Sequence, residues 1–189
     1  MFSGIFGGAS IVITLYLWRH DRVLLGRRVS AGAAAETEPV QKTLQALAAL
    51  AFAAELLVPA FDRRYGGSSV PPAVSLAADV AVIVGFALVF AVFGENSFTA
   101  ATIRISEGQR VVTPGPYAVV RHPMYAGALG LLLGTPVALG SWWGLLAFGP
   151  MLVVIAVRLV HEEHYLSQRL AGYADYCRVV RFRLLPRVW

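Results

Sequence analysis

The stretch AVSLAADVAVIVGFALVFAVF, residues 73–93, carries one charged side chain, Asp79, in 21 consecutive positions. A helix needs roughly 20 predominantly apolar residues to cross the hydrocarbon core of a bilayer. We therefore predict a transmembrane helix over residues 73–93. It is the clearest such signal in the chain.

The composition extends this prediction to the whole chain of 189 residues, which is 57% hydrophobic and 14% charged. Soluble domains carry roughly 25% charged residues, so the chain is predicted to be an integral membrane protein with a single domain, residues 1–189. The net charge is +5, but the basic residues lie between apolar runs. Membrane lipids are therefore the expected surroundings, and a nucleic-acid partner is not expected.

Four more apolar runs surround residues 73–93, and together they predict an all-α fold with five transmembrane helices. Three spans are expected within residues 1–93 and two within residues 94–189. The link at 140–144 is so short that the last two spans should form a helical hairpin. The additional runs are residues 4–18, 44–61, 124–139 and 145–160.

The links and the second apolar run carry weaker local signals. Thr37 is predicted to cap the second helix and Pro39 to lie in its first turn, after residues 31–36, whose composition favours flexibility. The alternation at 103–105 indicates a short extended piece. Glu55 either lines a pocket, lies near the interface, or is protonated and bonded to a neighbouring helix.

The basic residues are distributed unevenly between the links. With the first link inside, 14 of the 16 Lys and Arg residues lie on one side, and only Arg63 and Arg64 lie on the other. The positive-inside rule then predicts an external N-terminus and a cytoplasmic C-terminus. This places residues 113–127, the Glu162–Glu163 pair and the C-terminal tail on the cytoplasmic side, which we expect to be that of a bacterial inner membrane.

Residues 113–127, TPGPYAVVRHPMYAG, are unusually polar for this chain. Three prolines predict an ordered, non-helical path that holds Arg121 and His122 at the start of the fourth helix. The hairpin should bring His122 close to the Glu162–Glu163 pair. Adjacent residues of a helix point about 100° apart, so one glutamate can face a pocket while the other pairs with a cation. The alternative is a polar connector that merely separates two helices.

Several kinds of catalytic site are disfavoured by spacing. His161 and His164 are three residues apart, whereas two imidazoles bind one zinc ion at a spacing of four, so no metal is expected. Cys177 has no neighbouring acid–base partner, and no Gly-rich phosphate loop follows a strand. What is left is a pocket with carboxylates, arginine, histidine and aromatic rings. Carboxylates suit a cationic group, arginine suits a carboxylate, and aromatic faces suit adenine or a sulfonium; S-adenosylmethionine combines these features.

The motifs in the second half resemble a known family. They are G-P-Y-x-x-V-R-H-P-x-Y-x-G over 115–127, R-x-x-x-E-E-x-x-L over 158–166, Y-x-x-Y over 173–176 and L-x-P over 184–186. Together they resemble the isoprenylcysteine carboxyl methyltransferases, most closely the bacterial branch, and more distantly the phospholipid N-methyltransferases. The resemblance covers residues 94–189.

This resemblance implies a methyltransferase that uses S-adenosyl-L-methionine, with its cofactor-binding and catalytic part in residues 94–189. Glu162 and Glu163 would hold the cofactor's amino group or brace its pocket. Arg158 and Arg183 would lie near the methyl acceptor, and with Glu162 they form the implied catalytic set. The other implied cofactor-binding residues are Tyr117, Val120, Arg121, His122, Pro123, Tyr125 and Gly127.

The acceptor is expected to be a lipophilic molecule that enters from the bilayer, past Glu55 or Asp79. The carboxylate of an isoprenylated cysteine is one candidate. Two other classes stay open at this point. The first is an NADPH-dependent membrane reductase of the sterol reductase type, in which the basic tail would bind the extra phosphate. The second is a non-catalytic membrane protein that binds lipid.

Overall fold

The structure is a computed structural model, and it describes residues 1–36, 38–99, 102–103 and 105–189. Within these residues every regular element is helical, which confirms the predicted all-α class. Two short 3₁₀ turns, η1 (Ala33–Ala35) and η2 (Gly115–Ala118), lie in the links. The helices are α1 (Phe2–His20), α2 (Arg22–Val29), α3 (Pro39–Tyr65), α4 (Pro72–Glu95), α5 (Pro123–Ala138), α6 (Leu145–Arg169) and α7 (Tyr173–Val179).

Four of the described helices, α1, α3, α4 and α6, are long and apolar enough to cross a membrane. The apolar helix α5 has only 16 residues, so the fifth span stays a prediction. The long helices expose large apolar side chains on their outer surfaces, as expected of helices that face lipid. Examples are Ile11, Leu50, Val84, Leu146 and Val153.

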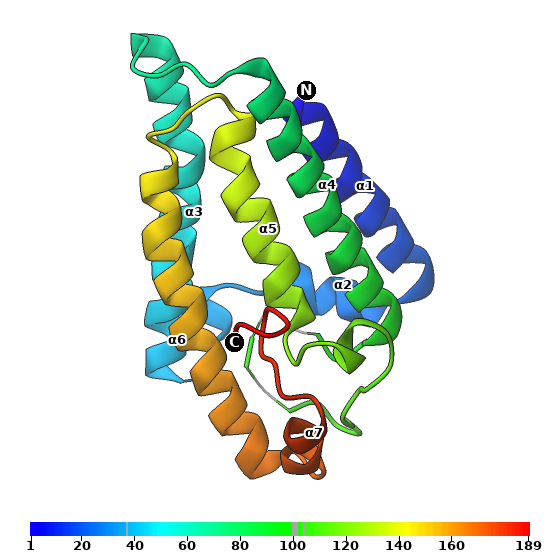
Figure 1. Cartoon of the computed structure of the whole chain (residues 1–189). Coiled ribbons are helices and arrows are strands. Elements are labelled where there is room, and N and C mark those ends of the chain that lie inside the picture. The colour runs from blue at the N-terminus through cyan, green and yellow to red at the C-terminus, as the bar shows by residue number, and fades with distance from the viewer. Residues whose placement is uncertain (37, 100–101, 104) are drawn as a thin grey trace.

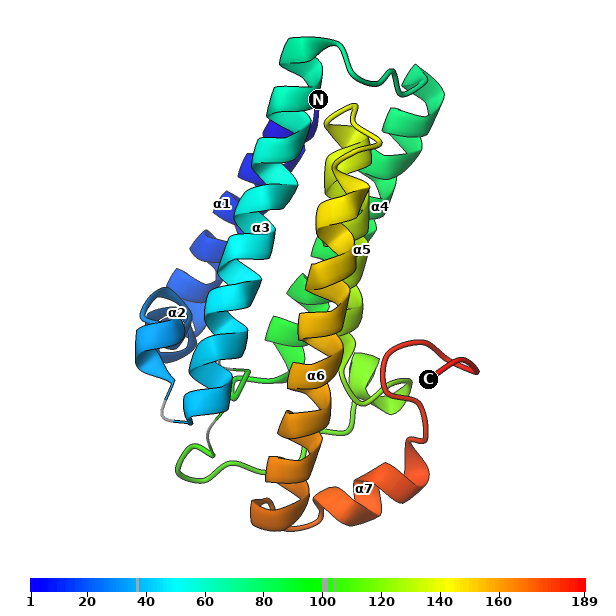
Figure 2. The same ribbon diagram turned by 90° about the vertical axis from the view of Figure 1, so that its left-hand side faces the viewer.

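The long helices lie side by side, as Figures 1 and 2 show. Helix α5 packs mainly against α4, and α6 packs mainly against α3. Residues 139–144 join α5 to α6 and form the predicted hairpin. The N-terminus and the links at 66–71 and 139–144 gather at one end, whereas α2, residues 105–122, α7 and the tail gather at the other. This two-ended arrangement agrees with the charge pattern, and the orientation in the membrane stays a prediction.

Small residues bring α4 and α5 into close contact. A Cβ atom added at Gly127 would lie 3.0 Å from the backbone oxygen of Gly85, and one added at Gly134 would lie 2.9 Å from the backbone oxygen of Ala78. Small residues at a helix crossing allow the backbones to approach, which is a common way of stabilising helix pairs in membranes. This contact fixes the start of α5, and therefore the position of the polar segment before it.

Some local predictions hold and others do not. Pro39 lies in the first turn of α3, and Glu38 is its N-cap residue. The predicted N-cap Thr37 lies outside the described residues, as does Arg104 in the predicted extended piece at 103–105. The expectation of flexibility over residues 31–36 is wrong for Glu36, which is 3% exposed, because its carboxylate pairs with an arginine of α6.

The two acids of the apolar runs are both buried. Glu55 is 0% exposed, and neither of its carboxyl oxygens has a hydrogen-bond partner among the described residues. Asp79 is 4% exposed and lines a second hollow together with Arg63, at the end of the bundle that carries the N-terminus. The acceptor is predicted from the sequence to enter from the bilayer past one of these two acids.

Candidate active site

The polar segment before α5 is held in place by hydrogen bonds from three other elements. It turns at Gly115, whose φ of +62° and close contact with the Glu95 side chain both require glycine. The Asn96 side-chain amide donates to the Tyr117 hydroxyl at 2.9 Å, and the Tyr176 hydroxyl donates to the Tyr117 carbonyl at 2.7 Å. The path is ordered as predicted, although η2 adds one helical turn that was not expected.

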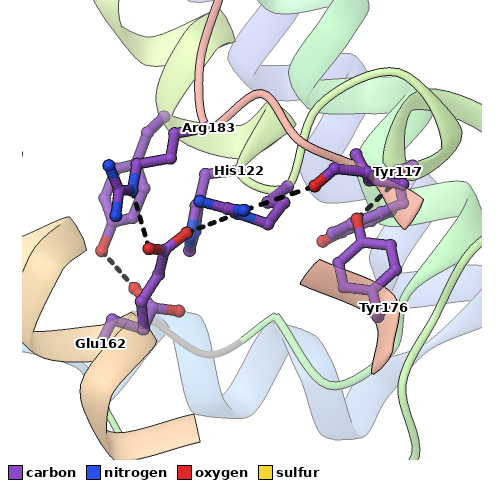
Figure 3. A network of polar contacts seen from close by, with 9 residues as sticks. Tyr117, His122, Glu162, Tyr176 and Arg183 are labelled. Atoms are coloured by element: carbon purple, nitrogen blue, oxygen red, sulfur yellow. Dashed lines mark hydrogen bonds and ion pairs between the residues drawn. The ribbon is translucent and has the colours of Figure 1, made fainter. Parts of the chain in front are cut away.

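The C-terminal tail lies along this segment. The backbone N–H of Arg121 donates to the carbonyl of Phe182, and that of His122 donates to the carbonyl of Arg183, both at 2.9 Å. Figure 3 shows side chains from residues 117–122, α6, α7 and the tail converging on one region. Elements that are up to about 70 residues apart in sequence therefore build one site.

The Glu163 carboxylate contacts three basic side chains in this region. Its carboxylate accepts from Arg121 Nε at 2.6 Å and from Arg183 Nε at 2.7 Å, and it lies 3.1 Å from His122 Nε2. The predicted proximity of His122 to the glutamate pair is confirmed. Two arginines on one mostly buried carboxylate form the strong, charge-assisted kind of hydrogen bond. Glu163 therefore fixes the tail and the segment before α5 to helix α6.

Glu162 points elsewhere, as expected for adjacent residues of a helix. The Tyr125 hydroxyl donates to its carboxylate at 2.7 Å, and Arg158 Nε donates to the same Tyr125 oxygen at 3.2 Å. Glu162 also lines the cavity described below. The two glutamates thus divide into one that faces a pocket and one that pairs with cations.

Arg158 is tied to the N-terminal half of the chain by two contacts that local sequence did not reveal. One terminal nitrogen of its guanidinium donates to Glu36 at 2.7 Å, and the other donates to Gln45 of α3 at 2.9 Å. The second oxygen of Glu36 accepts from the backbone N–H of Ile103 at 3.2 Å. An isolated acid in a small-residue link gives no sign of such a role, because its partner lies 122 positions away.

We expect Glu36→Gln to destabilise the protein by about 3–5 kcal/mol, since it leaves the buried Arg158 without its carboxylate. Chemical denaturation in detergent micelles measures the free energy of unfolding. Glu38→Gln is the matched control, because Glu38 is exposed and forms no side-chain cap. Equal stabilities for the two variants would show that the Glu36–Arg158 pair contributes little.

A cavity of about 640 Å³ lies beside these residues, a size typical of small-molecule sites. The four long helices and α5 all contribute to its lining. Of the predicted site residues, those that line it are Tyr117, Arg121, His122, Pro123, Tyr125, Arg158 and Glu162. The apolar lining includes Ile13, Leu17, Phe86, Val89, Leu131, Met151, Val154 and Ile155.

The other predicted site residues do not line the cavity and lie behind the residues that form its wall. Val120 is 5% exposed, and Gly127 lies against α4. Glu163 and Arg183 form the ion pair that holds the wall in place. Neither Glu55 nor Asp79 is among the lining residues of this cavity.

The tyrosines of the site are neutral at ordinary pH. Burial raises the pKa of the Tyr176 hydroxyl to about 12. Burial also raises the pKa values of Tyr117 and Tyr173 above the ordinary value for tyrosine. Their aromatic faces and hydroxyl groups border the polar end of the cavity.

Comparison with known families agrees with this geometry. Residues 74–171, just over half of the chain, match the family described as phospholipid methyltransferase. The chain belongs to the phospholipid methyltransferase family. The matched region contains η2, Arg121, His122, Arg158 and both glutamates, so it covers this part of the candidate site.

A curated relative is "Protein-S-isoprenylcysteine O-methyltransferase B" of Arabidopsis thaliana, which is 38% identical to this chain over 88 residues. The aligned part is 45% of this chain and 45% of the relative, so the chain spans less than half the length of the curated protein that it matches. The resemblance predicted from the motifs is confirmed at the level of the family, and the bacterial branch stays a prediction. Helices α1 and α2, Glu36 and the tail lie outside the region matched by the phospholipid methyltransferase family.

Proposed function

We propose that this protein is an S-adenosylmethionine-dependent methyltransferase that acts on a lipophilic acceptor at the membrane. The observation that carries the proposal is a single cavity with two chemically different ends. Its polar end is bordered by Glu162, His122 and four tyrosines, and its apolar end lies between helices long and apolar enough to face the bilayer. One cavity can therefore receive a polar donor and the reacting end of a lipid at the same time.

The residues at the polar end fit the cofactor by their chemistry. The Glu162 carboxylate suits the amino group of S-adenosylmethionine, and the rings of Tyr117 and Tyr173 suit adenine or the sulfonium. Arg121 and His122 lie on the wall of the cavity and suit the cofactor's carboxylate. When bound, the cofactor would supply an electrophilic methyl group.

The remaining site residues would act by position. Val120 and Gly127 would support the wall from behind, and Pro123, in the first turn of α5, would form part of the wall. Glu163 and Arg183 would hold Arg121 and His122 in their places. Arg158 would keep Tyr125 oriented toward Glu162 near the acceptor. In this assignment residues 94–189 provide most of the donor site, with Gln45 of α3 and the link at Glu36 as supports.

Proximity would supply most of the rate enhancement, since holding two reactants in the right geometry lowers a barrier by about 7–11 kcal/mol. A carboxylate acceptor, such as that of an isoprenylated cysteine, is ionised at neutral pH and needs no strong base. The long apolar lining would exclude water from the reacting atoms. We place the donor site on the cytoplasmic side of a bacterial inner membrane, on the strength of the charge pattern.

The test is the choice of cofactor. We expect S-adenosylmethionine to bind the purified protein in calorimetry and to raise its melting temperature, whereas NADPH should do neither. Labelled methyl groups should then appear on N-acetyl-S-farnesylcysteine or on an extracted membrane lipid. Stabilisation by NADPH alone would favour a reductase, and folded protein that binds neither cofactor would favour a non-catalytic lipid-binding protein.

A further inference from the structure

The arginines that line the cavity differ in their surroundings. Arg121 pairs with Glu163, and Arg158 pairs with Glu36. Arg110 is exposed to solvent. Arg28 of α2 is partly buried, lines the cavity, and has no carboxylate oxygen within 4.0 Å among the residues that the structure describes. Among the described residues that line the cavity, Arg28 is therefore a partly buried arginine that forms no ion pair with a carboxylate.

The Arg28 guanidinium lies over an aromatic ring. Its guanidinium carbon lies 5.0 Å from the centroid of the Phe93 ring, which also lines the cavity. A cation over an aromatic ring gains about 0.5–2 kcal/mol, which offsets only part of the cost of removing a charge from water. Burial accordingly lowers the pKa of the Arg28 guanidinium, while the electrostatic influence of Tyr125 raises it.

The rest of this part of the cavity suits a hydrocarbon chain. Leu17, Leu25 and Phe93 line it beside Arg28, and Leu17 and Phe93 belong to one packed apolar cluster with Leu25 against it. A guanidinium presents a planar set of donors that matches an oxyanion in a bidentate manner. The complementary ligand is therefore an amphiphile with one oxyanion group at the end of an apolar chain.

We propose that Arg28 binds the anionic group, carboxylate or phosphate, of the lipid acceptor. The proposal rests on the proposed function and specifies its substrate class. Arg158 is already neutralised by Glu36 and would orient Tyr125, while Arg28 receives the charge of the acceptor. Because α2 lies outside residues 74–171, acceptor selectivity would be encoded in the part of the chain that the family match does not cover.

The test compares three probes with the same farnesyl chain. They are N-acetyl-S-farnesylcysteine, its carboxamide and farnesyl monophosphate, each titrated into the full chain in detergent with and without S-adenosylhomocysteine. We expect the wild type to bind at least one anionic probe about tenfold or more tightly than the carboxamide, as for a hydrogen bond to a charged group. Arg28→Met should remove this preference and leave the affinity for the carboxamide unchanged, and Arg28→Lys should retain part of it.

Arg27→Met is the matched control, because it removes the same charge from the same helix at a position that does not line the cavity. It should preserve the preference. The identity of the preferred anionic probe separates a carboxylate acceptor from a phosphate acceptor. If Arg28→Met does not fold, Arg28→Gln carries the same expectation.

Three results would overturn the proposal: no anionic preference in the wild type, an unchanged preference in Arg28→Met, or an equal loss for all three probes. The last result would assign Arg28 a packing role. Binding of S-adenosylhomocysteine is measured separately in the same titrations. Its absence, together with an anionic preference that depends on Arg28, would refute the methyltransferase proposal while leaving the lipid site in place.

Discussion

Glu163→Gln should release the C-terminal tail from the rest of the protein. The substitution leaves two arginines and a histidine without their shared carboxylate, and the side chain of Arg121 is only 9% exposed. Breaking a buried ion pair by removing one partner costs about 3–5 kcal/mol. We therefore expect faster proteolysis after residue 179 and a lower free energy of unfolding. S-adenosylmethionine binding should fall below detection, since the tail and residues 121–122 form one wall.

Limited proteolysis followed by mass spectrometry locates the first cleavage, and calorimetry measures the binding. Glu107→Gln serves as the control, because Glu107 is exposed and should behave like the wild type. A tail in Glu163→Gln that resists protease as well as the wild type does would mean that backbone hydrogen bonds alone hold it.

Glu162→Gln should have the opposite profile, with stability retained and cofactor affinity lost. Glutamine can still accept the hydrogen bond from Tyr125, so the cavity wall should keep its shape. The negative charge is lost, however, and a hydrogen bond between charged groups contributes about 1.5–3 kcal/mol. This corresponds to a loss of about tenfold to a hundredfold in affinity for S-adenosylmethionine.

Calorimetric titration of S-adenosylmethionine measures this loss, and the melting temperature without ligand should match that of the wild type. His161→Gln is the neighbouring control, because His161 is exposed on the same helix and does not line the cavity. Wild-type affinity in Glu162→Gln would place the cofactor's amino group elsewhere. Equal changes in stability and in cofactor affinity for Glu162→Gln and Glu163→Gln would contradict the assignment of cofactor binding to Glu162 and of cation pairing to Glu163.

The helices were predictable because hydrophobic length is a local property. Residues 73–93 carry enough apolar side chains to identify α4 without any knowledge of its neighbours. The hairpin was also predictable, since the link at 140–144 is too short for another arrangement. The short helices α2 and α7 were not predictable, because eight and seven residues contain too few turns for a clear pattern.

The site was predictable where its residues are close in sequence or joined by the hairpin. Proline spacing located Arg121 and His122, and the hairpin placed them beside Glu162 and Glu163. Glu36, Gln45 and Arg28 could not be found in this way. Their partners or surroundings come from distant parts of the chain. Locally, Glu36 belongs to an ordinary link, Arg28 to a positively charged link and Gln45 to an apolar run.

The position of the tail also sets the order of events during synthesis. The backbone carbonyls of Phe182 and Arg183 complete the hydrogen bonding of residues 121–122, and Arg183 completes the charge pairing of Glu163. The spanning helices precede the tail and enter the bilayer first. While residues 182–183 are still inside the ribosome, residues 121–122 and Glu163 lack these partners. Under the proposed function, methyl transfer would therefore require the finished tail as well as the inserted helices.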